Sequence, residues 1–312
     1  MKKLLLLLLA LLTFAFIGLY LFIPSTVKFG KIVFLRCNIN IATRYIYDDA
    51  KWKTWWHSGD SLIKKEEGEY NYKNYRYTVE RHTLEGLYIS IAHDSGTIHS
   101  FLHIVPVNAD TIAVEWNGEF PETHDPIKKI RNYLQAVRVK DNISGVLQNV
   151  KDFSENESKV YGLDITQQQV KDTILVSTRS YFSTNPSTAQ IYEMIRDLKN
   201  YISFNRGIET GDPMLNITRD SGFFKTMVAI PVNRVLPQNK KFLLKKMVPG
   251  KILVAEVKGG SYTAGEALDK LKLYMDDNHR ASPAIPFESL ITDRSKEPDT
   301  AKWVTKIYFP VY

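Results

Sequence analysis

In the first half of the chain, hydrophobic and polar residues alternate with the period of half-buried β-strands. Apolar side chains occupy every second position in 75–79, 87–91 and 112–116, and a further apolar run covers 98–105. The segment Asp94-Ser95-Gly96, between two of these runs, is typical of a hairpin turn. Because tight turns join neighbouring antiparallel strands, the pattern predicts an antiparallel meander.

After Pro126 the alternation gives way to a helical period. Apolar positions then recur mainly at spacings of three and four residues: Ile127, Ile130, Leu134, Val137, Val146, Val150 and Phe153. With Pro126 in the first turn, this predicts a long amphipathic helix that continues past a weak point at 141–145. A strand-like run at 27–35 and a short helix at 38–47 precede the meander. The order strand, short helix, meander and long helix is typical of an α+β domain.

The C-terminal half of the chain reads as a tandem repeat. Phe224–Val232 and Trp303–Val311 share one pattern: an aromatic residue, three residues, an apolar residue, two residues, Pro and Val. Their prolines are 310 − 231 = 79 residues apart, and the runs Ile174-Leu-Val176 and Ile252-Leu-Val254 start 252 − 174 = 78 residues apart. Such a period predicts a duplicated unit. Each copy reads as strand, helix, strand, strand, at 172–179, 188–201, 213–217 and 223–232, and again at 251–258, 264–278, 287–292 and 302–311.

Two stretches of the second copy carry a family resemblance. They are Pro249-Gly-Lys-Ile-Leu-Val-Ala-Glu-Val-Lys-Gly-Gly-Ser-Tyr262 and, after the helix, Thr305-Lys-Ile-Tyr-Phe-Pro-Val311. Residues 165–312 thereby resemble the GyrI-like effector-binding domain of bacterial multidrug-responsive regulators, which implies a cleft for small molecules. In that family the last strand usually has an acidic residue four positions before the proline, which recognises cationic ligands or supports hydrolysis. This chain has Lys306 there, and a lysine neither accepts a hydrogen bond nor neutralises a cation, so we expect an anionic or neutral ligand, or none.

The N-terminal half carries a second resemblance. Its early strand at 27–35, the segment Trp52-Lys-Thr-Trp-Trp56 and the long last helix resemble the START-like (SRPBCC, polyketide-cyclase-like) superfamily over residues 27–155. The resemblance implies a hydrophobic cavity between the sheet and the long helix. The three tryptophans have two readings, a packed corner between helix and sheet or one wall of an apolar pocket, and both can hold together.

The N-terminus predicts a membrane anchor. Lys2 and Lys3 precede an uncharged run from Leu4 to Ile23, about the ~20 residues that a membrane-spanning helix needs. The run has no small-x-small cleavage site, so an uncleaved anchor is favoured over a cleaved signal. The lysines would stay cytoplasmic, which predicts a single-pass membrane protein whose bulk is extracytoplasmic. The expected domains are an anchor at 1–25, a START-like domain at 26–158 and a GyrI-like domain with an internal repeat at 159–312.

Charge and cysteine content narrow the function classes. The net charge of +7 is spread along the chain, and no helix-turn-helix or zinc-finger spacing accompanies it, so nucleic acid is not an expected partner. The single cysteine, Cys37, excludes an intramolecular disulfide, and its apolar surroundings favour a buried core residue over a catalytic thiol.

The candidate ligand-binding residues are mostly aromatic, because aromatic walls with few polar groups suit small-molecule sites. They are Trp52, Trp55, Trp56, Tyr181, Phe224, Tyr262, Trp303, Lys306 and Tyr308. The histidines at 93, 99 and 103 are better explained as polar positions of a half-exposed sheet than as zinc ligands. We find no phosphate-binding glycine loop, nucleophile elbow or convincing acid–base pair, so no catalytic residue, metal or cofactor is expected.

Three hypotheses follow. The first is a non-catalytic, membrane-anchored protein that binds or senses a small apolar or amphipathic ligand. The second is a hydrolase that uses the GyrI-like cleft. The third is a structural or partner-binding envelope protein with filled cavities, whose protein partner the sequence does not identify.

Overall fold

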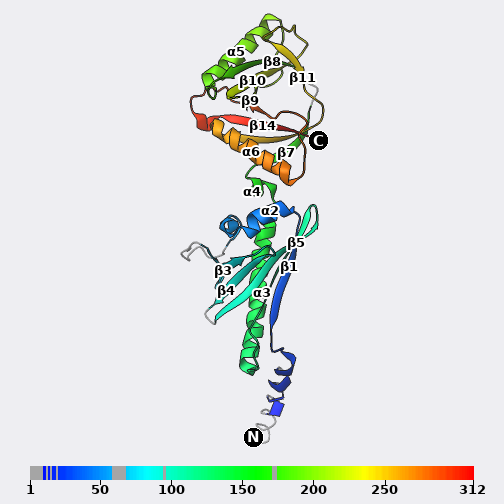
Figure 1. The fold of residues 1–312 in the computed structure, drawn as a ribbon, viewed down its shortest axis with the longest axis vertical. Coiled ribbons are helices and arrows are strands. Elements are labelled where there is room, and N and C mark those ends of the chain that lie inside the picture. Colours follow the sequence, from blue (N-terminus) through cyan, green and yellow to red (C-terminus); the bar gives the residue numbers. More distant parts are fainter. Residues whose placement is uncertain are drawn as a thin grey trace. The chain divides into compact units, whose positions relative to one another are not determined.

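The computed structural model describes residues 10–11, 13–14, 16–18, 20–57, 68–93, 96–170 and 174–312. The chain divides into two compact units, Met1–Asn156 and Glu157–Tyr312. Each unit is built on its own antiparallel sheet (Figure 1). The α+β class and the antiparallel meander predicted for the first half are therefore confirmed, and the sheet of the second unit is antiparallel as well.

The first unit, Met1–Asn156, contains a six-stranded sheet in the order β1-β6-β5-β4-β3-β2. Its strands are β1 (Lys28–Leu35), β2 (Glu69–Tyr72), β3 (Tyr75–His82), β4 (Leu87–His93), β5 (Gly96–Asn108) and β6 (Thr111–Glu119). The predicted alternation is visible in β6, where Ile112, Val114 and Trp116 are fully buried. Short helical segments at Ile39–Ala42 (α2), Thr43–Tyr47 and Asp49–Thr54 lie between β1 and β2.

The long helix α3 (Pro126–Ser154) closes this unit. Asp125 caps it, because its carboxylate accepts hydrogen bonds from the backbone N–H groups of Ile127 and Lys128, and Pro126 occupies the first turn. Lys129 is buried in the first half of the helix, but the buried apolar side chains start only at Ala136 and continue through Val139 and Ile143. The helix is confirmed, but Ile127, Leu134 and Val137, which the pattern assigned to the apolar face, are exposed. Its weak point at Gly145 has a packing reason, since a Cβ there would collide with the Tyr72 ring.

The second unit, Glu157–Tyr312, contains an eight-stranded sheet in the order β11-β8-β10-β9-β13-β14-β12-β7. Its strands are β7 (Ile165–Gln169), β8 (Ile174–Phe182), β9 (Met214–Asp220), β10 (Phe223–Val232), β11 (Leu243–Lys246), β12 (Lys251–Lys258), β13 (Phe287–Leu290) and β14 (Val304–Val311). Its helices are α4 (Glu157–Tyr161), α5 (Thr188–Phe204) and α6 (Ser261–Asp277). The repeat is visible in the topology, because β8-α5-β9-β10 and β12-α6-β13-β14 run in the same order and meet where β9 pairs with β13.

Helices α5 and α6 cover one face of this sheet. A capping box between Ser187 and Gln190 starts α5, whose apolar side chains Ile191, Ile195 and Leu198 pack in one core with side chains of β8, β10 and β13. Leu290 of β13 belongs to this core and pairs with Thr305 of β14, so both point to the same face. From Thr305 onward every second residue of β14 is buried, where α6 packs on β12 and β14. The opposite face of the sheet is left open by both helices.

The predicted membrane anchor needs correction. Among the residues that the structure describes, no helix is both long and apolar enough to cross a membrane. Residues 1–9, 12, 15 and 19 of the predicted anchor lie outside the described residues. The predictions of a transmembrane helix, of membrane attachment and of an extracytoplasmic bulk are corrected by this finding.

Candidate functional site

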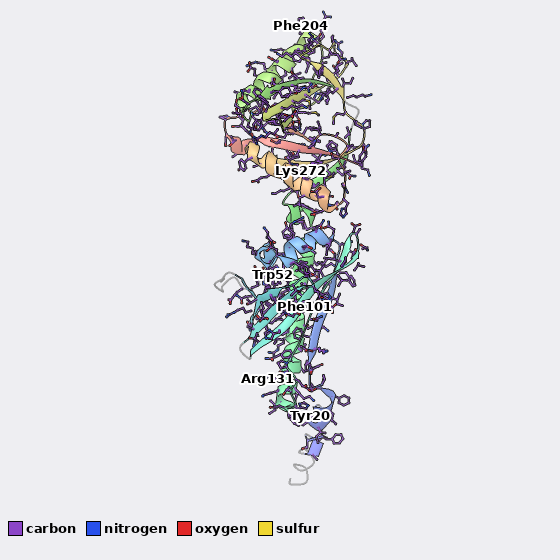
Figure 2. The ribbon with its side chains drawn as sticks, viewed as in Figure 1. Tyr20, Trp52, Phe101, Arg131, Phe204 and Lys272 are labelled. Carbon is purple, nitrogen blue, oxygen red and sulfur yellow. The ribbon has the colours of Figure 1, made fainter. Side chains whose placement is uncertain are left out.

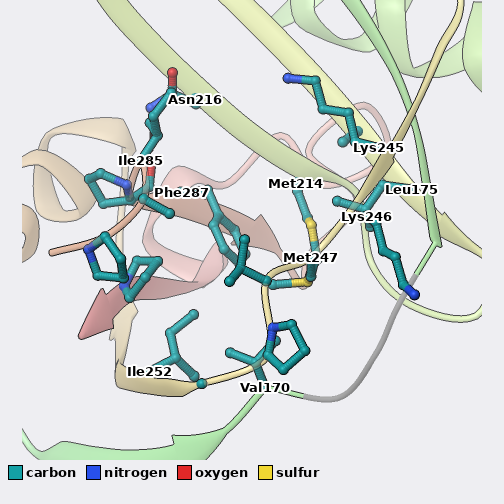
Figure 3. Close-up of a pocket in the computed structure, with 18 of the residues that line it drawn as sticks. Val170, Leu175, Met214, Asn216, Lys245, Lys246, Met247, Ile252, Ile285 and Phe287 are labelled. Carbon is teal, nitrogen blue, oxygen red and sulfur yellow. Dashed lines mark hydrogen bonds between the residues drawn. The ribbon is translucent and has the colours of Figure 1, made fainter. Parts of the chain in front are cut away.

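A pocket of about 380 Å³ lies on the open face of the second unit's sheet. Its floor is a set of strand side chains that the register places on one face, since Ala229 pairs with Met214 and Met227 pairs with Asn216. Phe287 of β13 and Ile252 of β12 extend the floor. Figure 3 shows Met214, Met247 and Phe287 gathered about the middle of this space, with Lys245 at its edge. We refer to it as the apolar pocket.

Two connecting segments form the rim of the apolar pocket, Lys246–Gly250 and Pro283–Pro286. Hydrogen bonds tie both segments to the rest of the unit: the Asn216 side-chain amide donates to the Pro286 carbonyl at 2.9 Å, and the Val170 N–H donates to the Gly250 carbonyl at 2.7 Å. Large apolar side chains of the rim are nevertheless exposed, namely Val248 (66%), Ile285 (56%) and Tyr312 (82%). An apolar opening of this kind marks a binding surface more often than an inert one.

The chemistry of the apolar pocket favours binding over proton transfer. Among its described lining residues there is no histidine, cysteine or side-chain carboxylate, and the one side-chain hydroxyl is that of Tyr312. Its polar groups are the Asn216 amide and the ammonium groups of Lys245, Lys246 and Lys251. General acid–base catalysis most often uses a histidine or carboxylate side chain beside the reacting atom, and the described lining has neither. The arrangement suits a ligand with a compact apolar body.

A second cavity of about 180 Å³ adjoins the first and shares Asn216, Met227, Lys245 and Ile285 with it. We refer to it as the basic pocket, because Arg179, Lys225, Lys240, Lys241 and Lys245 line it and no described lining residue is acidic. Burial, followed by the charges of Arg179 and Lys225, holds the pKa of Lys245 below its usual value. The Lys245 ammonium lies 2.9 Å from the Met227 sulfur, where the two cavities meet.

The three predicted tryptophans of the first unit lie in its core, and Figure 2 labels Trp52 among them. Trp52, at 0% exposure, stacks on Trp56 with ring centres 5.3 Å apart. Each indole N–H has a backbone partner: Trp52 donates to Ile46, Trp55 to Tyr45 and Trp56 to Asn71. Packed rings with satisfied N–H groups favour the packed-corner reading of this cluster. Their role in ligand binding stays a prediction.

The predicted residues of the second unit are spread over both faces of its sheet. Tyr181 is exposed on β8, two residues from Arg179 and on the open face, whereas Phe224 lies on the helix-covered face, with the Arg219 guanidinium 5.9 Å from its ring. Tyr262 is exposed in the first turn of α6. None of these three residues lines the apolar or the basic pocket.

The remaining predicted residues lie on or before β14. Trp303 is buried under the Arg294 guanidinium, 4.9 Å from the ring, and its indole N–H donates to the Glu297 carbonyl. The Lys306 ammonium lies 3.5 Å from the Glu256 carboxylate on β12, so its charge is partly offset. Tyr308 stacks on Phe287 with ring centres 5.0 Å apart. Tyr308 therefore packs beside Phe287 of the pocket floor. The ligand-binding role of Trp303, Lys306 and Tyr308 stays a prediction.

None of the residues that line the apolar pocket was among those predicted from the sequence. They are chiefly Met, Ile, Pro and Val side chains of the strands and of two connecting segments. The signals that could have found them are the segments Met247-Val-Pro-Gly250 and Pro283-Ala-Ile-Pro286. Each is an apolar, proline-containing connection before a strand of the second copy, where a solvent-facing loop would normally be polar.

The histidines considered as metal ligands have other partners. His99 lies 3.1 Å from the Glu80 carboxylate, His103 lies 3.5 Å from that of Glu115, and the His93 ring packs on Tyr75. Within the described part of the chain, no group of three or more His, Cys, Asp or Glu residues could hold a metal ion.

No protein-family model matches the sequence, and no curated protein matches it. The fold is similar to solved structures at low identity. The EcmrR C-terminal domain is 17% identical, with a TM-score of 0.42 over 48% of this chain and 98% of that chain. A complex of EcmrR with DNA is 14% identical, with a TM-score of 0.42 over 67% and 88%. The protein SAV2435 bound to tetraphenylphosphonium is 14% identical, with a TM-score of 0.32 over 48% and 94%.

GyrI-like effector-binding domains are thus among the structural neighbours of this chain, while the relation of residues 26–158 to START-like proteins stays a prediction. The partner prediction is corrected in two respects. The expectation from the sequence excluded nucleic acid, whereas one of the similar structures is a complex of EcmrR with DNA. The membrane partner is corrected together with the predicted anchor, because no helix among the described residues is long and apolar enough to cross a membrane.

Proposed function

We propose that the second unit is a non-catalytic binding module for a small molecule with a compact apolar body. The observation that carries this proposal is the apolar pocket of about 380 Å³ on the face that α5 and α6 leave open. Small-molecule sites usually have volumes of roughly 300–1,000 Å³ and mainly apolar walls. A cavity at the small end of that range suits one or two fused rings or a short branched chain.

The residues at the rim of the apolar pocket also favour ligand binding, in addition to those of its floor. Val248, Ile285 and Tyr312 expose apolar surface around the opening, and a ligand that contacts them removes this surface from water. Each Å² of apolar surface that is buried contributes about 25 cal/mol. Burial of apolar surface at both the walls and the rim therefore contributes to the binding free energy of the ligand.

The hydrolase hypothesis has less support. The described lining of the apolar pocket has no carboxylate or histidine, and Lys306, which stands where the family's acidic residue is expected, pairs with Glu256 at 3.5 Å. The carboxyl group of Glu288 has a raised pKa because it is buried, but it lies on the helix-covered face beside Arg294, away from the open face. We find no observation that favours hydrolysis over binding.

A thermal-shift screen of the 312-residue chain tests the proposal. The library contains small compounds with one or two rings or short branched chains, in neutral, anionic and cationic forms. The matched control is Ala229→Phe, because Ala229 points into the pocket from β10 and a phenyl ring there fills part of the cavity. A ligand at about 100 times its Kd stabilises the folded state by about 2.7 kcal/mol, which raises the Tm by several degrees.

We expect at least one compound to raise the Tm of the unmodified chain and to lose this effect in Ala229→Phe. The proposal fails if no compound raises the Tm, or if every active compound acts equally on the variant. Native mass spectrometry of the gently purified chain gives a second readout, since a co-purifying mass that Ala229→Phe lacks identifies the ligand directly.

A further inference from the structure

We propose that the basic pocket binds the anionic group of the ligand whose apolar body occupies the apolar pocket. The ligand is then an organic anion, such as a carboxylate or sulfonate joined to a compact apolar group. This inference rests on the proposed function and specifies its ligand. It is carried by the way in which the two cavities join and by the charges on their shared border.

The two cavities form one continuous site. Asn216, Met227, Lys245 and Ile285 line both of them. Because these four residues are common walls, one molecule can extend from the methionine-rich floor into the space between the cationic side chains. The combined site is apolar at one end and cationic at the other, which fits an amphipathic anion.

The cations converge because the strand register places them on one face. Met227 pairs with Arg179, and Lys225 lies two residues before Met227 on β10, so Arg179 and Lys225 share the open face. Lys245 of β11 pairs with Leu175, which lies four residues before Arg179 on β8 and therefore points the same way. Three side chains from three neighbouring strands thus meet over one cavity.

Nothing among the described residues neutralises these three charges. Lys241, the neighbouring cation, pairs with Asp197 at 2.7 Å. For Arg179, Lys225 and Lys245, no carboxylate lies within ion-pair distance in the part of the chain that the structure describes. The charges of Arg179 and Lys225 also disfavour the protonated form of Lys245. Like charges held together without a counter-ion cost free energy, and a bound anion offsets that cost.

The donors suit a planar or tetrahedral oxyanion. An arginine guanidinium offers a fixed fork of N–H groups, and each lysine ammonium offers three donors that rotate freely. The Ser177 hydroxyl is used elsewhere, since it donates to the Leu243 carbonyl at 3.2 Å. The Asn216 amide holds the rim through Pro286. The anion is therefore recognised by Arg179, Lys225 and Lys245, with Lys306 excluded by its pair with Glu256.

Isothermal titration of the 312-residue chain with three probes of one shape tests the inference. The probes are 1-naphthaleneacetate, the neutral 1-naphthaleneacetamide and the cationic (1-naphthyl)methylammonium. The acetate is expected to bind about tenfold more tightly than the amide, the effect of about one charge-assisted hydrogen bond at a partly exposed site, and the cation most weakly. Higher salt should narrow the difference between acetate and amide.

The double variant Lys225→Gln/Lys245→Gln should bring the affinity for the acetate to within about threefold of the affinity for the amide. Its control is Lys272→Gln/Lys302→Gln, which removes the same charge from two surface ion pairs, with Asp269 and Asp299, and should keep the tenfold preference (Figure 2 shows Lys272 on α6).

The outcomes separate the two proposals. Equal binding of acetate and amide to the unmodified chain overturns the anion site and leaves the proposed function standing. A preference for acetate that survives Lys225→Gln/Lys245→Gln overturns the assignment to the basic pocket. Binding that Ala229→Phe does not weaken, or no binding of any probe, overturns both.

Discussion

The two units have similar architectures but differ in the side chains that cover their sheets. Each has an antiparallel sheet that carries helices, but the first unit packs large aromatic rings on its sheet, whereas the second has the apolar pocket on the open face of its sheet. In the first unit Trp52, Trp56, Tyr77 and Trp116 form a chain of ring contacts with centres 5.2–5.6 Å apart. In the second unit the described lining of the apolar pocket is chiefly methionine, isoleucine, proline and valine, with Phe287 and Tyr312 as its aromatic residues. The difference teaches that side-chain volume on the sheet decides between a core and a pocket.

The largest effect should come from truncating one ring in each unit. Trp52→Ala removes a fully buried side chain from a packed cluster and should lower the free energy of unfolding by about 3–5 kcal/mol. Phe287→Ala removes a ring from a wall that already faces a cavity and should cost only about 0.5–1.5 kcal/mol, mainly its stacking on Tyr308. Urea denaturation measures both. Equal losses would contradict the contrast between filled core and open pocket.

Cys37 gives a chemical probe of the first unit. Burial, helped by the Glu155 charge, raises the pKa of its thiol to about 12 from 9.0. Only the thiolate reacts, so at pH 8 the reactive fraction in the folded unit is about a thousandfold below that of the unfolded chain. We expect slow labelling by a disulfide reagent such as DTNB, and labelling that accelerates with urea as the first unit unfolds. Because the chain has one cysteine, the signal reports this unit alone.

The two substitutions of the first prediction are its controls. Trp52→Ala should accelerate labelling of Cys37, whereas Phe287→Ala, in the other unit, should leave the rate unchanged. Rapid labelling of the unmodified chain at pH 8 without urea would show that Cys37 is not held in a packed core.

Substitution of one helix glycine in each unit tests the comparison further, with smaller expected changes in the free energy of unfolding. In α3, Gly145 allows Tyr72 to approach, and a Cβ there would meet the Tyr72 ring and hydroxyl. Gly145→Ala should therefore cost about 1–2 kcal/mol although alanine favours helices. In α6, Gly265 has nothing within 4 Å of an added Cβ, so Gly265→Ala should stabilise the chain by about 0.5–1 kcal/mol. Unfolding in urea distinguishes the signs, and a gain from both variants would mean that Tyr72 moves aside freely.

The spacing of hydrophobic residues and the internal repeat predicted most of the helices and strands. Alternation found β3 to β6, and the repeat found the strand–helix–strand–strand order of both halves of the second unit. The strands β2, β7 and β11 were missed. Residues 167–169 of β7 are all glutamine, which has little intrinsic strand preference, and the segment becomes a strand by pairing with β12. β11 lies in the connection between the repeats and pairs with β8.

The candidate site was harder to predict for a physical reason. Aromatic residues were chosen as pocket walls, yet Trp52, Trp55 and Trp56 are large enough to fill the space they enclose. The pocket lies instead where Ala229, Met214 and Met227 leave volume empty under two apolar connections. A cavity depends on what the neighbours do not fill, and that depends on strand register across the repeat, which hydrophobic periodicity does not specify.

The smallest effect should be the response of anion binding to pH. Lys245 has a pKa below its ordinary value, first because of burial and then because of Arg179 and Lys225. An anion favours the charged ammonium, so its affinity should be constant near neutral pH and fall as pH rises through the lowered pKa, before ordinary lysines lose their protons. The other cations around the cavity are Arg179, which keeps its charge, and Lys225, Lys240 and Lys241.

Titration of 1-naphthaleneacetate at pH values from 7 to about 10 measures this response, with a fall of roughly threefold expected for one partly exposed charge. The amide should show no fall, and Lys245→Gln should bind the acetate weakly with a flatter profile. In the unliganded protein the charge of Lys245 is unfavourable, whereas it favours anion binding. Because folding disfavours the Lys245 ammonium, Lys245→Gln should not lower the Tm of the unliganded chain at pH 7. Weaker binding without lost stability is typical of a residue kept for its ligand. A Tm that falls together with the affinity would instead identify Lys245 as a structural residue.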